Sequence, residues 1–205
     1  MPHKDCPSGY LSVTEVINLG FPKVNVSKSG KPYFYLEQWR GRVGNIKANA
    51  ITEESKKIGK EFHSQIEYGF NTGRWLAEGN IGRMVTNLYN YFLRPFYVAP
   101  LQLEHTCQDK RLKIQGTYDA AIITNKGEYV ADWKTSNSWS RPVLGMQLAA
   151  YDYLRKGSGK GVGVRVDKEK DVVDIEWFED LKPYWKLFKH CYEIAKVQKF
   201  GMKNG

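Results

Sequence analysis

The sequence has few cysteines and no long apolar run. Its three cysteines, Cys6, Cys107 and Cys191, lie far apart, and none forms a Cys-x-x-Cys pair. This spacing favours neither a disulfide framework nor a zinc or iron–sulfur site, and it fits a reducing compartment. No apolar segment approaches the roughly 20 residues that a transmembrane helix needs. The first seven residues also lack the apolar core of a secretory signal and the arginine-rich pattern of an import signal.

Internal repeats and low-complexity tracts are absent as well. The 205 residues are 41% hydrophobic and 26% charged, which predicts a single globular domain spanning residues 1–205. We expect a soluble cytoplasmic protein with no membrane partner. The formal net charge of +9 suits a polyanionic partner, although many basic proteins are simply basic. Charge alone therefore does not define the function.

Two apolar, β-branched runs flank a turn at residues 125–127 and predict an antiparallel hairpin. The first run carries Asp119 and the second carries Asp132, where strands ordinarily bury apolar side chains. Burying two unpaired carboxylates close together is costly. One resolution is an ion pair between Asp132 and Lys134, because side chains two apart on a strand point the same way. The other is a divalent cation such as Mg²⁺, which would neutralise both aspartates and lie beside Lys134.

A helix is predicted from Thr52, as its N-cap, to a stop signal at residues 71–73. Gly59, His63 and Glu67 recur every four residues and share one stripe of this helix. Taken alone, a histidine in such a stripe is more often a surface or core residue than a metal ligand. The adjoining, buried stripe comprises Ile58, Phe62, Ile66 and Phe70.

Further helices are predicted near residues 14–19, 82–97, 143–156 and 182–200, and strands at 101–107, 112–123, 128–134, 162–167 and 172–178. Residues 36–50 are compatible with a helix, in which Arg40 would contact phosphate or lie on a solvated basic face. Glu104 would reach the hairpin or cap the sheet. Residues 157–161 superficially resemble a phosphate loop but lack its first glycine and its Ser or Thr, so they are interpreted as a turn. The helices predicted at 82–97 and 143–156 contribute core residues, listed here together: Met84, Leu88, Tyr91, Phe92, Phe96, Leu144, Leu148 and Tyr151 or Leu154. For the aromatic residues of the helix at 82–97, a stacking wall is the alternative role.

Several short motifs follow one another in a particular order. They are Gly59-Lys60-Glu61-Phe62-His63 on a helix, Gly116-Thr117-Tyr118-Asp119 and Asp132-Trp133-Lys134 on the hairpin, and Gln147-x-x-x-Tyr151 on the next helix. From Trp39 onward, this order resembles the PD-(D/E)XK nuclease superfamily. Within it, the chain is most similar to the RecB-like branch, which includes the mitochondrial genome maintenance exonucleases and their phage and bacterial relatives.

The resemblance implies an α/β fold with a restriction-endonuclease-like core, in which helices flank a mixed central β-sheet. A helical lobe would span residues 36–98, the sheet core with the active site 99–178, and a C-terminal helix 179–205. The implied metal ligands are His63, Asp119, Asp132 and the backbone carbonyl of Trp133. They would hold two Mg²⁺ or Mn²⁺ ions, with Asp119, Asp132 and Lys134 as the catalytic residues. The implied or candidate substrate-binding residues are Gln147, Tyr151, Glu67, Thr135 and Arg40.

The implied function is that of a metal-dependent DNA exonuclease acting on single-stranded or frayed ends in replication, recombination or repair. A physical route to end specificity is a lobe through which a strand threads, with side chains that stack on bases or contact phosphates. The absence of a cysteine quartet excludes the iron–sulfur cluster of some relatives, and the absence of an import signal favours a bacterial or phage-infected cell. The alternatives are a structure-specific endonuclease and a nuclease-derived nucleic-acid-binding module without turnover. The residues proposed for threading are Arg40, Arg42, Lys47, Trp75, Arg83 and Tyr89, for which core and surface roles are the alternative.

Overall fold

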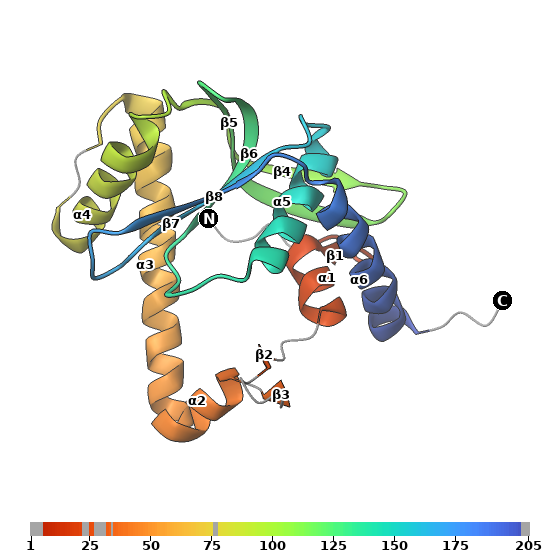
Figure 1. Cartoon of the computed structure of the whole chain (residues 1–205). Coiled ribbons are helices and arrows are strands. Elements are labelled where there is room, and N and C mark those ends of the chain that lie inside the picture. The colour runs from red at the N-terminus through yellow and green to blue at the C-terminus, as the bar shows by residue number, and fades with distance from the viewer. Residues whose placement is uncertain (1–5, 22–24, 27–31, 34, 76–77, 202–205) are drawn as a thin grey trace.

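A mixed β-sheet with helices on both faces forms the body of the protein (Figure 1). This computed structural model describes residues 6–21, 25–26, 32–33, 35–75 and 78–201. The six strands of the sheet are β1 (Leu11–Ser12), β4 (Ala99–Asp109), β5 (Ile114–Thr124), β6 (Gly127–Lys134), β7 (Gly161–Val166) and β8 (Val173–Phe178). The expected α/β class and mixed central sheet are confirmed. Within the described residues, no helix combines the length and the apolar character needed to cross a membrane.

The strand β5 is the hub of the sheet. It pairs antiparallel with β4 along one edge and with β6 along the other, and it pairs parallel with the short β1. The β5–β6 connection is the predicted tight turn, and Gly127 at φ 119° supplies the backbone conformation that glycine adopts most readily. Beyond β6, the sheet continues through parallel β7 to antiparallel β8.

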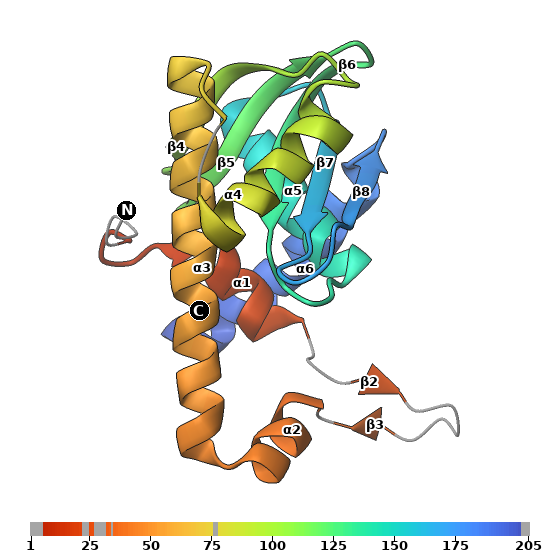
Figure 2. The ribbon, with the colours of Figure 1, turned by 90° about the vertical axis from the view of Figure 1, so that its left-hand side faces the viewer.

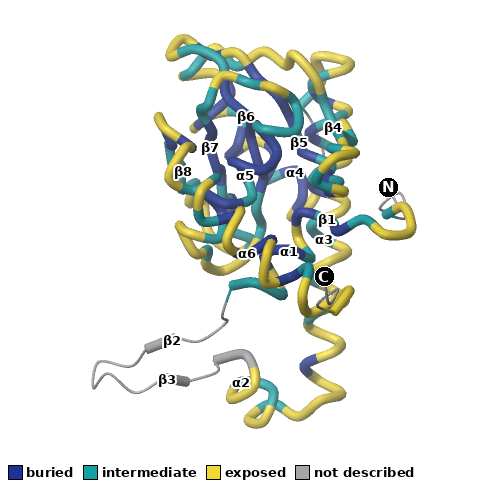
Figure 3. Tube along the Cα trace, turned by 90° about the vertical axis from the view of Figure 1, so that its right-hand side faces the viewer, coloured by how far each residue is buried: buried dark blue, intermediate teal, exposed yellow. Residues whose placement is uncertain are grey.

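Two hydrophobic cores lie on opposite faces of the sheet, and the most buried segments run along the central strands (Figure 3). One core packs α1 (Val13–Gly20), α5 (Arg141–Arg155) and α6 (Lys182–Phe200) against the sheet. The other packs α3 (Asn45–Thr72), α4 (Gly79–Leu88) and the π-helix η1 (Tyr89–Leu93) against the opposite face. The hairpin therefore has helices on both sides, and its side chains alternate between the two cores.

The long helix α3 differs most from the prediction. It begins at Asn45 rather than at Thr52, after a break at Gly44 (φ 80°) that separates it from α2 (Tyr35–Val43). Thr52 is not an N-cap, because its hydroxyl donates to the carbonyl of Ala48 within the helix. The first part of α3 projects with α2 away from the sheet (Figures 1 and 2), and Ile46 is 90% exposed there. A short pair of strands, β2 (Asn25–Val26) and β3 (Pro32–Tyr33), precedes α2.

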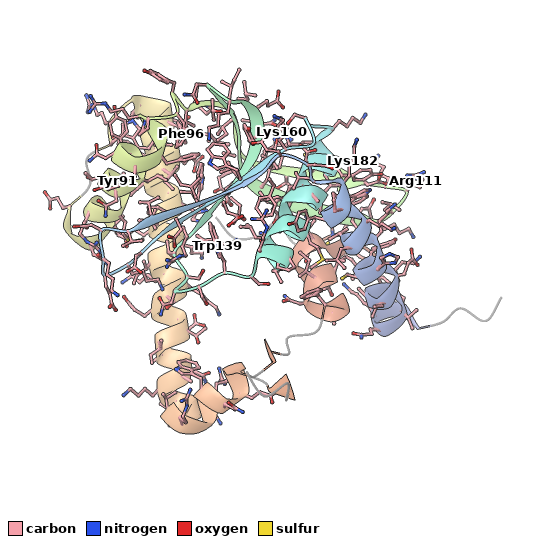
Figure 4. The ribbon with its side chains drawn as sticks, viewed as in Figure 1. Tyr91, Phe96, Arg111, Trp139, Lys160 and Lys182 are labelled. Carbon is pink, nitrogen blue, oxygen red and sulfur yellow. The ribbon has the colours of Figure 1, made fainter. Side chains whose placement is uncertain are left out.

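Smaller differences concern helix ends and packing. The helix predicted at 82–97 starts at Gly79 as α4 and changes to a π-helix at Tyr89. Tyr91, predicted in the core, is 55% exposed and lies on the outer side of this region (Figure 4). Within the stripe predicted for α3, Phe62 and Ile66 are buried, whereas Ile58 and Phe70 pack at its margin. The helix predicted at 182–200 matches α6 at both ends.

Candidate metal centre

The hairpin opens at the end remote from its turn. Residues 120–124 of β5 pair with β6, and residues 114–115 pair with β1. Between them, residues 116–119 have no strand partner on this edge among the described strands. The backbone N–H of Trp133 donates instead to Asp119 Oδ2, at 2.7 Å. The Asp119 carboxylate thus ends the ladder, and β6 turns away from β5 beyond it.

Asp132 and Lys134 lie on β6 at this open end, which we define as residues 116–119 of β5 and 132–134 of β6. The Asp132 carboxylate is 1% exposed, and Lys134 Nζ lies 2.9 Å from its Oδ1 and 2.8 Å from its Oδ2. The ammonium donates to Oδ1 and lies equally close to Oδ2, so it pairs with both carboxylate oxygens. Burial would lower the pKa of Lys134, but Asp132 and Asp119 raise it overall, so the ammonium stays charged. The ion pair considered from the sequence is therefore present.

His63 reaches the open end from α3. Its Nδ1 lies 3.5 Å from Asp119 Oδ1 and 3.5 Å from Glu104 Oε1. Its Nε2 lies 3.1 Å from the carbonyl oxygen of Trp133, close enough for an N–H at this position to donate. Burial would lower the pKa of His63, but the carboxylates of Asp119 and Glu104 raise it to about 9. The two carboxylates therefore favour a positive charge at the position of this imidazole.

Glu104 lies across the ladder from Asp119. Its neighbours on β4, Leu103 and His105, pair with Ala120 and Tyr118, so Glu104 falls opposite Asp119 in register. Its backbone has φ 43°, a left-handed conformation that is uncommon for a residue other than glycine. Of the two roles considered from the sequence, the structure places Glu104 at the site.

These donors fit a hard divalent cation. Ligand atoms of His63, Glu104 and Asp119 all lie within 4.8 Å of one another. Burial raises the pKa of Asp119, and the neighbouring Asp132 adds to the increase. Mg²⁺ and similar ions take carboxylate and carbonyl oxygens, and a cation here would offset this concentration of negative charge. Coordination by His63 would require the neutral imidazole, so binding would release its proton.

A cleft of about 420 Å³ opens beside these groups. Its α3 wall presents Lys60 one turn before His63, Lys56 two turns before it, and Glu67 one turn after it. Cleft volumes of roughly 300–1,000 Å³ are typical of small-ligand sites. The lining residues are Lys56, Gly59, Lys60, His63, Ser64, Glu67, Glu104, Thr117 and Asp119.

Gln147 and Tyr151 approach the site from α5, on the other face of the sheet. Gln147 Nε2 donates to the Tyr151 hydroxyl at 3.2 Å, and Tyr151 is 5% exposed. Burial and the nearby Asp132 raise the pKa of Tyr151 to about 12. The Tyr151 ring also lies against β5 at Gly116, where an added Cβ would come within 2.6 Å of the ring. The pair therefore packs against the open end from the α5 face of the sheet.

The two remaining candidate residues differ in their distance from the open end. Thr135 packs against α3, since an added Cβ on Gly59 would lie 3.6 Å from its Oγ1. Arg40 is remote, because its guanidinium donates to Asn49, roughly 21 Å before His63 along α3 at the usual helical rise. The structure therefore brings together His63, Asp119, Asp132, Trp133, Lys134, Glu67, Thr135, Gln147 and Tyr151, but not Arg40.

Three of the residues proposed for threading have structural roles. Arg83 pairs with Asp171 at 2.9 Å, and the Trp75 ring packs between Phe70 and Tyr89. The basic side chains that do line the cleft are Lys56 and Lys60, which the sequence analysis did not select. Lys56 lies three residues before Gly59 and Lys60 three residues before His63, so the i, i+3 neighbours of the predicted stripe include both lysines.

Comparisons with known proteins do not indicate a function for this site. No protein-family model matches the chain, and no curated protein matches it. A solved structure described as "Crystal structure of SSO0001" is similar, with 15% sequence identity and a TM-score of 0.49. The alignment covers 94% of this chain and 78% of that one.

Proposed function

We propose that the protein is a metal-dependent deoxyribonuclease with a restriction-endonuclease-like core of the RecB-like type. The observation that carries this proposal is the arrangement of the open end. There, the Asp119 carboxylate replaces the strand ladder, Asp132 holds Lys134, and His63 faces Asp119 from α3. A buried carboxylate pair beside a lysine and a histidine suits phosphodiester hydrolysis with a hard divalent ion.

In this proposal, Asp119, Asp132, the Trp133 carbonyl and His63 hold Mg²⁺ or Mn²⁺. The bound ion would lower the pKa of a water molecule and polarise a phosphoryl oxygen. Lys134 remains charged beside Asp132, and its remaining N–H groups can orient water or donate to the phosphate as negative charge develops. Gln147 and Tyr151 keep the Asp132 side of the site in place from the α5 core.

The cleft supports a nucleic acid as the substrate. Lys56 and Lys60 place two cations along the cleft, one helical turn apart, where both can contact phosphates, although Lys56 is also paired with Glu53 at 2.7 Å. Beyond His63, Glu67 presents a carboxylate, which would repel phosphate and accept hydrogen bonds from bases. The backbone would therefore run along the lysine side. We propose single-stranded or frayed DNA ends as the preferred substrate, in replication, recombination or repair within a bacterial or phage-infected cell.

The direct test incubates end-labelled linear single-stranded DNA with the protein, first in EDTA and then with excess Mg²⁺ or Mn²⁺. We expect no products in EDTA and release of nucleotides or short fragments after the metal is added. Binding without cleavage by the wild-type protein in either metal would contradict the enzymatic proposal and favour the binding module.

A closed single-stranded circle of the same sequence tests the requirement for an end. We expect the linear strand to be degraded and the circle to be spared. Equal cutting of both substrates would establish an endonuclease. Salt dependence cannot replace this experiment, because phosphate contacts weaken with salt in either case.

A further inference from the structure

The cleft holds an acidic side chain that the metal set implied by the sequence does not include. His63 Nδ1 lies 3.5 Å from Glu104 Oε1 and 3.5 Å from Asp119 Oδ1. The imidazole nitrogen is thus shared between two carboxylates, one from β4 and one from β5. Asp132, by contrast, faces the ammonium of Lys134.

The fold directs Glu104 to this position. It stands opposite Asp119 in the β4–β5 register, four residues after the irregular pairing at Pro100, and its φ of 43° departs from the extended backbone of its strand. Its side chain is 27% exposed and lines the cleft rather than facing away from it. On the neighbouring strand, Asp132 is 1% exposed, and its two carboxylate oxygens lie 2.9 and 2.8 Å from Lys134 Nζ. Buried or half-buried carboxylates from three adjacent strands therefore meet at one place.

We propose that Glu104 is a ligand for a divalent cation held together with His63 and Asp119 on the cleft side of β5. In this arrangement, Asp119 is shared with the cation position formed by Asp132 and the Trp133 carbonyl. Two carboxylates, one imidazole and water molecules form an acceptable ligand set for Mn²⁺ or Mg²⁺. The inference rests on the proposed function for the role of this cation in the reaction, but its test uses no DNA.

Mn²⁺ binding by the apoprotein provides the first test, measured from the loss of the free Mn²⁺ electron paramagnetic resonance signal. We expect Glu104→Gln to weaken Mn²⁺ binding by about tenfold or more, as loss of a metal-site partner commonly does. Glu67→Gln is the matched control, because it removes the same charge from the same cleft outside the three-residue group. We expect it to weaken binding by less than about a factor of three, since its field is partly screened. Equal weakening by both variants, or no weakening by Glu104→Gln, would overturn the proposal.

A change of ligand chemistry separates direct coordination from an indirect effect through His63. Thiolate favours softer ions, so Glu104→Cys is expected to gain Cd²⁺ binding with a thiolate-to-cadmium absorption band in the ultraviolet. Wild-type protein, which has the same three native cysteines, gives the baseline, and Glu67→Cys is the control. A folded Glu104→Cys protein with no band above both references would show that this side chain does not contact the cation.

The two proposals can fail separately. Metal-dependent cleavage by the wild-type protein, together with unchanged Mn²⁺ binding by Glu104→Gln, would reject the Glu104 ligand and leave the nuclease proposal standing. Conversely, the Glu104→Gln variant could bind Mn²⁺ more weakly while the wild-type protein cleaves no DNA. That result would support the Glu104 ligand and reject the nuclease proposal.

Discussion

The β5–β6 hairpin is an ordinary antiparallel ladder at its turn end, whereas at its open end the two strands part around charged groups. From the Thr124–Gly127 pair to the Ala120–Ala131 pair, each position of β5 has a partner on β6. Ile122, Tyr129 and Val130 are all 0% exposed in this paired part. One step further, Asp119 and Asp132 take the place of apolar side chains. If the proposed function is right, the paired segment serves stability and the open end serves catalysis, so substitutions in the first should change folding and substitutions in the second should change cleavage.

The largest contrast is expected between Asp132→Ala and Val130→Ala, because the two residues lie on the same face of β6. Asp132→Ala should abolish cleavage while the fold remains, because in the proposed mechanism this carboxylate holds the metal and contributes no apolar packing. Lys134→Ala should also reduce turnover, by at least about 10²-fold, if its charge stabilises the transition state. Single-turnover cleavage rates and chemical denaturation measure the two properties.

Val130→Ala supplies the matched control. It removes buried methyl groups from the core beside α5 and should destabilise the fold by about 2 kcal/mol. Its cleavage rate, measured well below its unfolding transition, should stay close to that of the wild type. A folded Asp132→Ala protein with wild-type turnover would remove the open end from the mechanism.

Metal binding should stabilise the protein through the open end alone. A ligand that binds only the native state adds about 2.7 kcal/mol at one hundred times its dissociation constant. We therefore expect Mn²⁺ to raise the melting temperature of the wild type and of Val130→Ala by similar amounts, and EDTA to reverse the effect. Asp119→Asn should lose most of this response, because its carboxylate lies between both proposed cation positions. An undiminished response in Asp119→Asn would place the bound metal elsewhere.

His63→Ala should have a smaller effect than loss of either aspartate. His63 contributes one donor among several, so we expect about a tenfold shift in the Mg²⁺ and Mn²⁺ concentrations required for cleavage. The rate at saturating metal should recover more fully than in Asp132→Ala. Superimposable metal titrations for His63→Ala and the wild type would exclude the histidine from the ligand set.

The smallest expected effect concerns the support behind the open end. An added Cβ at Gly116 would come within 2.6 Å of the Tyr151 ring and 2.8 Å of Val13. Gly116→Ala should therefore cost about 1–3 kcal/mol through overpacking and slow cleavage modestly by shifting Asp119. Gly41→Ala is the control, because an added Cβ there meets no atom within 4 Å. Equal stability of the two variants would indicate that the Tyr151 contact adjusts without cost.

Much of the hairpin could be predicted because its signals are local. The alternation of apolar residues and the glycine-containing turn define β5 and β6, and the same pattern makes Asp119 and Asp132 conspicuous. The i, i+4 stripe of α3 likewise placed His63 and Glu67 on one face. The gathering of these residues with Gln147 and Tyr151 followed from the order of motifs, because that order resembles a known family.

Features that depend on tertiary structure could not be predicted in this way. The position of Glu104 results from a strand irregularity and a left-handed backbone conformation, neither of which has a sequence signal at that residue. The true start of α3 was missed because Thr52 and the following acids imitate an N-cap. In the helix, the Thr52 hydroxyl instead bonds to a carbonyl one turn back. Arg40 was selected by charge type, but the length of α3 places it far from the open end.

Anomalous scattering from Mn²⁺ in crystals of the wild-type protein tests the central claim most directly. We predict a peak within about 2.5 Å of an Asp119 carboxylate oxygen, with His63 or Asp132 among the other ligands. We also predict that this peak disappears in Asp119→Asn crystals grown under the same conditions. Fully occupied Mn²⁺ sites elsewhere, with none at the open end, would contradict the proposal that the parted strands of the hairpin form a metal centre.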